Sequence, residues 1–195
     1  MKTVNELPQG YAEILSVDLQ KNKRLALLVN AAAILIGVAL GVAGHFCVPI
    51  TALFDMSAGI VPYLVRFAVL AVASVAYILL HELVHGITMK LFGCPKVKYG
   101  FTGLYAFAGS DAYFGKTAYL AVALAPVVLW GIVLAVLCAV LPASWFWVAY
   151  IVQISNLSGA AGDLYVTLKF LGLPKDILVR DVGVSMTVYA PQTIA

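Results

Sequence analysis

The segment HELVHG, residues 81–86, holds two histidines and a glutamate whose spacing suits metal-dependent hydrolysis. An α-helix repeats about every 3.6 residues, so His81 and His85 would lie one turn apart on one helix face. Two imidazoles in that arrangement can bind one Zn²⁺, and zinc lowers the pKa of bound water to about 7. Glu82 stands beside them and can accept a proton from that water as a general base. The segment therefore predicts a zinc site with Glu82 as its catalytic residue.

The position of this segment in the chain strengthens the prediction. It ends an uncharged apolar run that begins at Phe67 and extends to Leu80. An acidic side chain in the middle of a membrane helix costs about 2.5–3.5 kcal/mol, so it is rarely placed there without a partner or a function. The alternative is that two core histidines simply hydrogen-bond to neighbouring helices.

A third metal ligand is expected because catalytic zinc sites usually have three protein ligands. The remaining histidine, His45, falls at the opposite membrane face, which leaves Asp111 in a loop and Asp163 in a late apolar run. The midpoint of the two motif histidines lies roughly 10 Å from Lys90, and Asp163 lies about 9 Å from Lys169, at about 1.5 Å per residue. This equal depth predicts Asp163 as the third ligand. A polar contact between helices is its alternative role.

The composition is that of a polytopic membrane protein, since 63% of the 195 residues are hydrophobic and 11% are charged. Four apolar runs have the roughly 20 residues that a membrane helix needs. They are Leu25–Gly44, Phe67–Met89, Ala118–Leu141 and Trp145–Leu168. The expected fold is all-α with four transmembrane helices. In the alternative topology, the third run forms two re-entrant halves around Pro126 and Gly131.

Basic residues predict the orientation, because they favour the cytoplasmic side. With four spans, Arg66 alone falls on one face. The other face holds Lys2, Lys21, Lys23, Arg24, Lys90, Lys96, Lys98, Lys116, Lys169, Lys175 and Arg180. Both termini are therefore expected in the cytoplasm of a cell-membrane protein. The net charge of +3 is interpreted as a topology signal, and no nucleic-acid partner is expected.

The expected organisation has three parts. Residues 1–24 form a cytoplasmic N-terminal segment, residues 25–170 form a four-helix metalloprotease-like domain, and residues 171–195 form a cytoplasmic tail. The segment LPQGYAEILSVDL alternates loosely, as a short strand would. The sequence leaves open whether PKDILVRDVGVSMTVY in the tail pairs with it as a strand.

The loop between the second and third runs carries strand spacing. Apolar and glycine residues occupy every second position from Val97 to Phe107, and these include Phe101 and Tyr105. The pattern predicts a short amphipathic β-hairpin at the cytoplasmic interface. Its alternative is an aromatic belt that anchors the protein in the membrane interface.

These motifs together resemble a known family. The segments LPQGYAEI, HELVHGITMKLFGCPKVKYGFTGLYAF and SNLSGAAGD resemble the putative zincin peptidase family of small multi-pass bacterial membrane proteins. More distantly, they resemble the site-2 protease intramembrane metalloproteases. The resemblance implies that His81, His85 and Asp163 hold zinc near the cytoplasmic side, with Glu82 as general base.

The chain also departs from the site-2 protease pattern, N-x-x-P followed by LDG. Asn156 has no proline three residues later, and Asp163 follows a glycine and precedes a leucine. Asn156 lies two turns before Asp163 and could bind substrate backbone or an oxyanion, or could pack between helices. An extended substrate could pair with the hairpin edge, which makes Phe101 and Tyr105 candidate substrate contacts.

The expected function is a membrane-embedded zinc metalloprotease. It would hydrolyse membrane proteins or membrane-proximal peptides near the cytoplasmic face, with the lipid bilayer as its surroundings. The alternative is a zinc-binding, non-proteolytic membrane scaffold or chaperone. A metal transporter is disfavoured because the ligands gather at one face and His45 has no companions.

Overall fold

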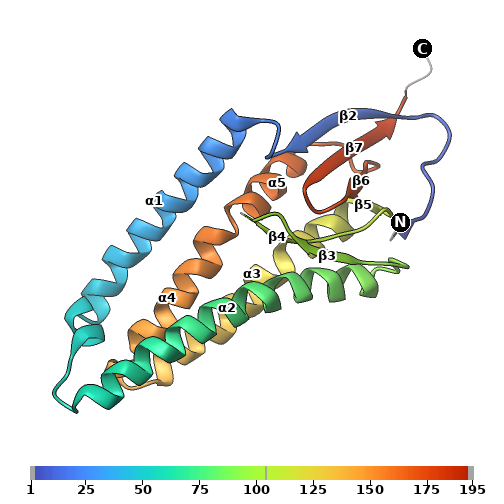
Figure 1. The fold of residues 1–195 in the computed structure, drawn as a ribbon. Coiled ribbons are helices and arrows are strands. Elements are labelled where there is room, and N and C mark those ends of the chain that lie inside the picture. Colours follow the sequence, from blue (N-terminus) through green and yellow to red (C-terminus); the bar gives the residue numbers. More distant parts are fainter. Residues whose placement is uncertain (1–2, 104, 193–195) are drawn as a thin grey trace. The chain divides into compact units, whose positions relative to one another are not determined.

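The computed structural model describes residues 3–103 and 105–192 (Figure 1). The chain divides into two compact units. One comprises the described parts of residues 1–28, 82–126 and 163–195, and it contains all the strands. The other comprises residues 29–81 and 127–162, and it is built from helices.

Helices make up most of the described chain. They are α1 (Lys23–Cys47), α2 (Ile60–Leu91), α3 (Lys116–Val140), α4 (Ala143–Gly159) and α5 (Ala161–Leu171), with a short 3-10 helix, η1 (Ile50–Phe54). Within the described residues, α1, α2 and α3 are long and apolar enough to cross a membrane.

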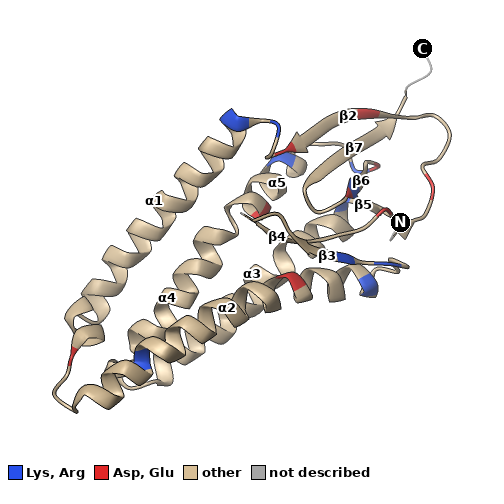
Figure 2. Ribbon diagram, viewed as in Figure 1, with Lys and Arg blue, Asp and Glu red and all other residues tan. Residues whose placement is uncertain are grey.

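The surfaces of these helices suit lipid rather than water. Leu35 in α1 and Val72 in α2 are each 70% exposed, although such side chains strongly favour burial in water. Long stretches of α1 and α2 carry no charged residue (Figure 2). α3 runs unbroken through Pro126, so the alternative of two re-entrant halves is not formed. A membrane protein is therefore indicated.

The prediction of a fourth continuous transmembrane helix is wrong. α4 ends at Gly159 and α5 begins at Ala161, so the fourth apolar run is broken inside SGAAGD. Glycine has poor helix propensity, and this segment has glycines at 159 and 162. The 17 residues of α4 span roughly 25 Å at about 1.5 Å per residue, less than the roughly 30 Å of a bilayer core.

The expected all-α class is also wrong, because the polar segments outside the apolar runs form a five-stranded sheet. Its strands are β1 (Thr3–Val4), β2 (Tyr11–Asp18), β5 (Tyr113–Gly115), β6 (Leu178–Asp181) and β7 (Ser185–Pro191). Their order is β1-β5-β6-β7-β2, with all neighbours antiparallel. The C-terminal segment does pair with the N-terminal strand, since β7 lies beside β2 (Figure 1). A lone strand is unstable in water, and β2 has β7 as its partner in the sheet, so β2 depends on a pairing that joins the two ends of the chain.

The predicted hairpin between α2 and α3 is confirmed. β3 (Lys98–Phe101) and β4 (Ala106–Gly109) pair antiparallel, from Lys98 opposite Gly109 to Phe101 opposite Ala106. Asp111, just beyond the hairpin, binds Lys98 Nζ at 2.5 Å and Arg180 Nη2 at 2.8 Å. The pairing with Lys98 and Arg180 lowers the pKa of the Asp111 carboxyl. These ion pairs join the hairpin to β6.

The core of the strand-bearing unit connects α5 to the sheet. Phe170 of α5, Phe114 of β5, Val179 of β6 and Val188 of β7 are all 0% exposed and belong to one cluster. Burying an aromatic or aliphatic side chain of this size contributes about 1.5–3 kcal/mol. α5 is therefore held firmly against the strands that follow it.

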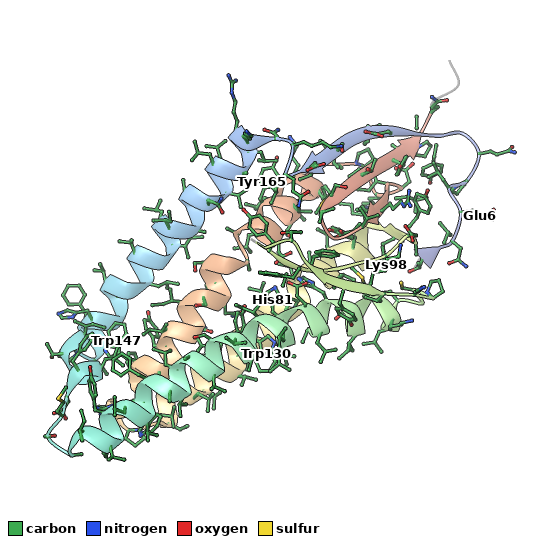
Figure 3. All side chains as sticks on the ribbon, in the orientation of Figure 1. Glu6, His81, Lys98, Trp130, Trp147 and Tyr165 are labelled. Carbon is green, nitrogen blue, oxygen red and sulfur yellow. The ribbon has the colours of Figure 1, made fainter. Side chains whose placement is uncertain are left out.

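The helical unit has its own contacts between distant segments. The indole N–H of Trp147, labelled in Figure 3, donates to the carbonyl of Val48 at 3.0 Å. The hydroxyl of Tyr150 donates to the carbonyl of Leu40 at 2.8 Å. Leu53, Phe146 and Trp147 form a buried cluster beside them. These contacts fix α4 against α1 and η1.

We expect Gly109→Ala to destabilise the protein. A Cβ at Gly109 would overlap the backbone of Val182 and Gly183, so the hairpin and the β6–β7 turn could not keep their close approach. Overpacking of this kind costs about 1–3 kcal/mol, so the melting temperature of the detergent-purified protein should fall by several degrees. Gly41→Ala is the matched control, because a Cβ there has no atom within 4 Å. Equal melting temperatures for the two variants would contradict the packing argument.

Candidate metal centre

α2 continues without a break through HELVHG, so the two histidines lie one turn apart, as predicted. Both are buried: His81 is 8% exposed and His85 is 9% exposed. Glu82, the next residue after His81, is half-buried. The motif therefore presents two imidazoles inside the protein, with a carboxylate beside them that retains contact with the surroundings.

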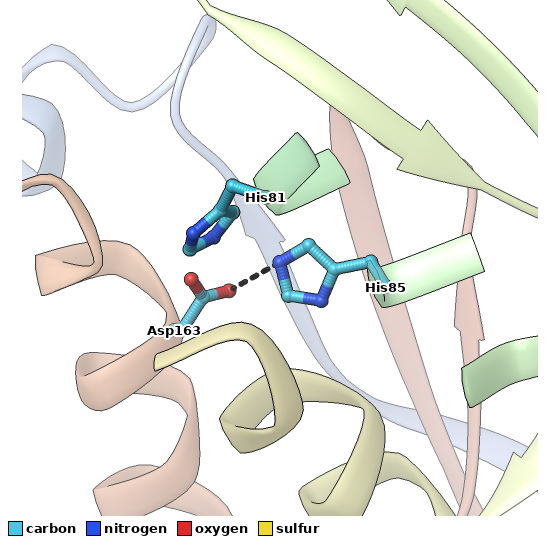
Figure 4. A group of neighbouring side chains, drawn as sticks. All are labelled: His81, His85 and Asp163. Carbon is cyan, nitrogen blue, oxygen red and sulfur yellow. Dashed lines mark ion pairs between the residues drawn. The ribbon is translucent and has the colours of Figure 1, made fainter. Parts of the chain in front are cut away.

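Asp163 lies in the first turn of α5, directly after the helix break. The N-terminal end of a helix carries a partial positive charge, which favours a carboxylate at that place. Its Oδ1 is 3.7 Å from Nε2 of His85 (Figure 4). The break in the fourth apolar run thus gives Asp163 a helix N-terminus, and the fold brings its carboxylate to the motif.

His81, His85 and Asp163 form the one group of donors in the described residues that could hold a metal ion. One donor atom from each lies within 4.8 Å of the other two (Figure 4). Two imidazoles and one carboxylate are a donor set typical of catalytic zinc, which keeps a fourth position open. These residues therefore fit zinc by both chemistry and proximity.

The orientation of His85 also fits a metal ligand. Its Nδ1 lies 2.9 Å from the carbonyl oxygen of Val122, and a carbonyl can only accept a hydrogen bond. In the neutral imidazole the proton is therefore on Nδ1, and the lone pair of Nε2 faces Asp163. Metal-binding histidines commonly use this arrangement, in which one nitrogen is held by a hydrogen bond and the other binds the ion.

The other residues singled out in the sequence are placed differently. Asn156 is 0% exposed and hydrogen-bonds to Tyr77 and Val127. Phe101, at the end of β3, is 70% exposed, and Tyr105 in the hairpin connection is 38% exposed. None of the three belongs to the group of metal donors. Asp111, the other acidic candidate in the sequence, is engaged by Lys98 and Arg180.

Sequence reasoning missed two contacts of the motif. Tyr77 precedes His81 by one helical turn and hydrogen-bonds to it, and it is one of few polar residues in its apolar run. Its spacing of four residues was the available signal. Gly86 was also passed over: the phenol of Tyr99 packs where a Cβ at Gly86 would lie. A glycine at the end of the motif thus lets β3 approach α2 closely.

Two buried imidazoles and a carboxylate, brought together by apolar helices, form a donor set that fits a zinc ion of the catalytic type. The comparison of the chain with protein families agrees with this class. A family described as "putative zincin peptidase" matches residues 74–178, which is more than half of the chain, and the protein belongs to this family. The match includes all three candidate ligands and Glu82. The family description implies zinc and peptide hydrolysis. No curated protein and no solved structure matches the chain significantly.

We expect the detergent-purified protein to contain one zinc ion per chain, measured by elemental mass spectrometry. His81→Ala and Asp163→Ala should each lose most of it, because three protein ligands are needed to hold the ion tightly. Glu82→Gln should keep it, since Glu82 is not in the donor group.

His45→Ala and Asp111→Ala are the matched controls, as they remove a histidine and a carboxylate from outside the donor group. Both should keep full zinc content. Zinc retained in Asp163→Ala, or absent from the wild type, would contradict a three-ligand site.

Proposed function

We propose that this protein is a membrane-embedded zinc metalloprotease. The observation that carries the proposal is the group of His81, His85 and Asp163, whose donor atoms lie within 4.8 Å of one another, with Glu82 next to His81 in the sequence. Membership of a family described as a zincin peptidase supports it. The substrates would be membrane proteins or membrane-proximal peptides.

The chemistry follows from the roles of these side chains. His81, His85 and Asp163 would hold zinc, which as a Lewis acid polarises the scissile carbonyl and activates water. Glu82 would accept a proton from the attacking water and pass it to the leaving amine. Its half-buried position suits this exchange, because a general base must reach both water and substrate.

The sheet supports an even number of membrane crossings. β1 and β2 precede α1, whereas β6 and β7 follow α5, yet all four belong to one sheet. An open sheet cannot extend through lipid, because the unpaired backbone groups at its edges are not tolerated there. Strands of one open sheet therefore lie on the same side of a membrane. With α1, α2 and α3 as three crossings, α4 and α5 together would make the fourth. The distribution of basic residues favours the cytoplasm for both termini.

A broken fourth crossing is compatible with a membrane if the break is covered by protein. Irregular backbone at membrane depth is tolerated where protein buries it or where it lines a polar cavity. Ala160, at the break, is 0% exposed, and its N–H donates to the carbonyl of Ser158. A discontinuous helix of this kind is a common way to place an ion ligand inside a membrane.

The hairpin offers an edge on which a substrate could bind as an added strand. Within the described residues, β3 pairs with β4 alone, and Lys98, Tyr99 and Phe101 on β3 are exposed. On β4, by contrast, Ala108 and Gly109 are buried. Tyr99 packs on Gly86, the residue after His85, so the free edge belongs to the strand held against the motif helix. Pairing with a free edge would extend a substrate and expose its peptide bonds.

We expect wild-type protein to cleave a fluorogenic peptide mixture in detergent, and Glu82→Gln to lose at least about 100-fold of this activity. General acid–base catalysis contributes about 10²–10⁴-fold, so loss of the proton acceptor should have an effect of this size. Zinc content should remain as in the wild type, which separates loss of chemistry from loss of the site.

Glu82→Asp serves as a control that keeps the carboxylate but shortens its reach. A wild type that binds zinc but cleaves no substrate, with an unaltered cellular phenotype for Glu82→Gln, would instead favour the non-proteolytic scaffold.

Replacement of Phe101 with proline should reduce peptide turnover without removing zinc. Proline lacks the backbone N–H, so the edge of β3 would lose a donor that an added strand needs. Tyr105→Pro should act in the same direction by distorting the hairpin connection. Phe101→Ala keeps the backbone donor and should reduce turnover less. Unchanged turnover in both proline variants would reject substrate binding at this edge.

A further inference from the structure

A chain of hydrogen bonds leads from His81 to a buried asparagine. The hydroxyl of Tyr77 lies 2.8 Å from Nδ1 of His81 and donates to Oδ1 of Asn156 at 3.0 Å. Nδ2 of Asn156 donates to the carbonyl of Val127 at 3.2 Å. All four residues lie in the helical unit, on α2, α3 and α4.

The direction of these bonds determines which nitrogen of His81 carries a proton. The amide nitrogen of Asn156 faces a carbonyl, so its oxygen must face Tyr77. The single hydroxyl proton of Tyr77 goes to that oxygen, and the hydroxyl can then only accept from His81. Nδ1 of His81 is therefore the protonated nitrogen, and the lone pair is on Nε2.

His85 reaches the same state by a different contact. The carbonyl of Val122 accepts from its Nδ1 at 2.9 Å. Both imidazoles of the motif are thus held at Nδ1 and present Nε2 as the donor atom. Nδ1 of His85 bonds to a backbone carbonyl of α3, whereas Nδ1 of His81 is held by the side chain of Tyr77, which is in turn bonded to that of Asn156.

We propose that Tyr77 and Asn156 are positioning residues that hold His81 in the tautomer and orientation needed to bind zinc. The inference rests on the metal centre of the proposed function and adds two residues to it. Hydrogen bonds from such supporting groups raise the affinity of a histidine for its metal, and their loss typically weakens binding about 10- to 100-fold.

The surroundings of Asn156 favour this role over a direct contact with substrate. The residue is 0% exposed, and both ends of its amide are engaged, by Tyr77 on one side and Val127 on the other. Gly131 of α3 faces it, since a Cβ there would lie 3.5 Å from Nδ2. A substrate could reach this amide only by displacing bonds that the protein already makes.

The test is the zinc dissociation constant of detergent-purified protein, measured by competition with a chromogenic chelator. Tyr77→Phe removes the hydroxyl and leaves the ring, and it should weaken zinc binding about 10- to 100-fold. Tyr150→Phe is the matched control, because it removes a tyrosine hydroxyl bonded to the carbonyl of Leu40 in the same unit. That control should bind zinc within about twofold of the wild type, since its hydroxyl bonds to Leu40 and is not among the hydrogen bonds that join His81, Tyr77 and Asn156.

Asn156→Leu provides a second variant and tests whether Asn156 acts through Tyr77. Alone, it should also weaken zinc binding, by a smaller factor than Tyr77→Phe. In the Tyr77→Phe background it should have no further effect, because groups in one hydrogen-bonded network are not additive. The visible spectrum of cobalt-substituted protein should change in both single variants and stay unchanged in Tyr150→Phe.

The outcomes separate this inference from the proposed function. A wild type without zinc affinity overturns both. A wild type that binds zinc, with unchanged affinity in Tyr77→Phe and Asn156→Leu, overturns the positioning role and leaves the metal centre standing. Reduced peptide turnover in Asn156→Leu with unchanged zinc affinity would assign Asn156 to the substrate and would also overturn it.

Discussion

Polar side chains in apolar surroundings need partners that compensate for the loss of water, and the arrangement around HELVHG answers this need. Buried imidazoles and carboxylates are costly unless each has a partner. Nδ1 of His85 is satisfied by the carbonyl of Val122 and Nδ1 of His81 by Tyr77, whereas Nε2 of His85 and the carboxylate of Asp163 face each other at 3.7 Å. His81, His85 and Asp163 could together hold a metal ion, which would complete this compensation. The site therefore specifies how α2 and the start of α5 must be placed.

The sheet gives this placement its rigidity. α5 begins two residues before Asp163 and carries in its last turn the buried Phe170, which packs with side chains of β5, β6 and β7. β2 forms the edge of the sheet and pairs with β7 along nearly its whole length. Residues from both ends of the chain thus stabilise the helix that carries the third donor. The buried cluster beneath these strands also includes Met89 of α2 and Val122 of α3, so the sheet and the helices share one core.

Sequence patterns predicted those parts of the structure that depend on residues close together in the chain. The spacing of His81 and His85 follows from helix geometry, and the alternation around Phe101 follows from strand geometry, so motif and hairpin could both be predicted. The sheet could not, because β2 and β7 stabilise each other over about 170 residues of intervening chain, and no pattern within either segment records that partner. The break at Ala160 could not be predicted from hydropathy, because hydropathy measures only how apolar a segment is. Alanine and glycine keep a segment apolar whether or not the helix continues through them.

The break also explains how a carboxylate is accommodated beside the two histidines. In an unbroken helix Asp163 would lie in the interior of the helix, where no end of the macrodipole compensates its charge. At the first turn of α5 it gains that compensation before any partner is counted. The family match covers the histidine motif and the helix break within one segment. Residues 74–178 include Tyr77, the motif, the hairpin, the break and Asp163. α1, β2 and β7 lie outside the matched segment. The matched segment therefore contains every residue of the candidate metal centre, whereas most of the five-stranded sheet lies outside it.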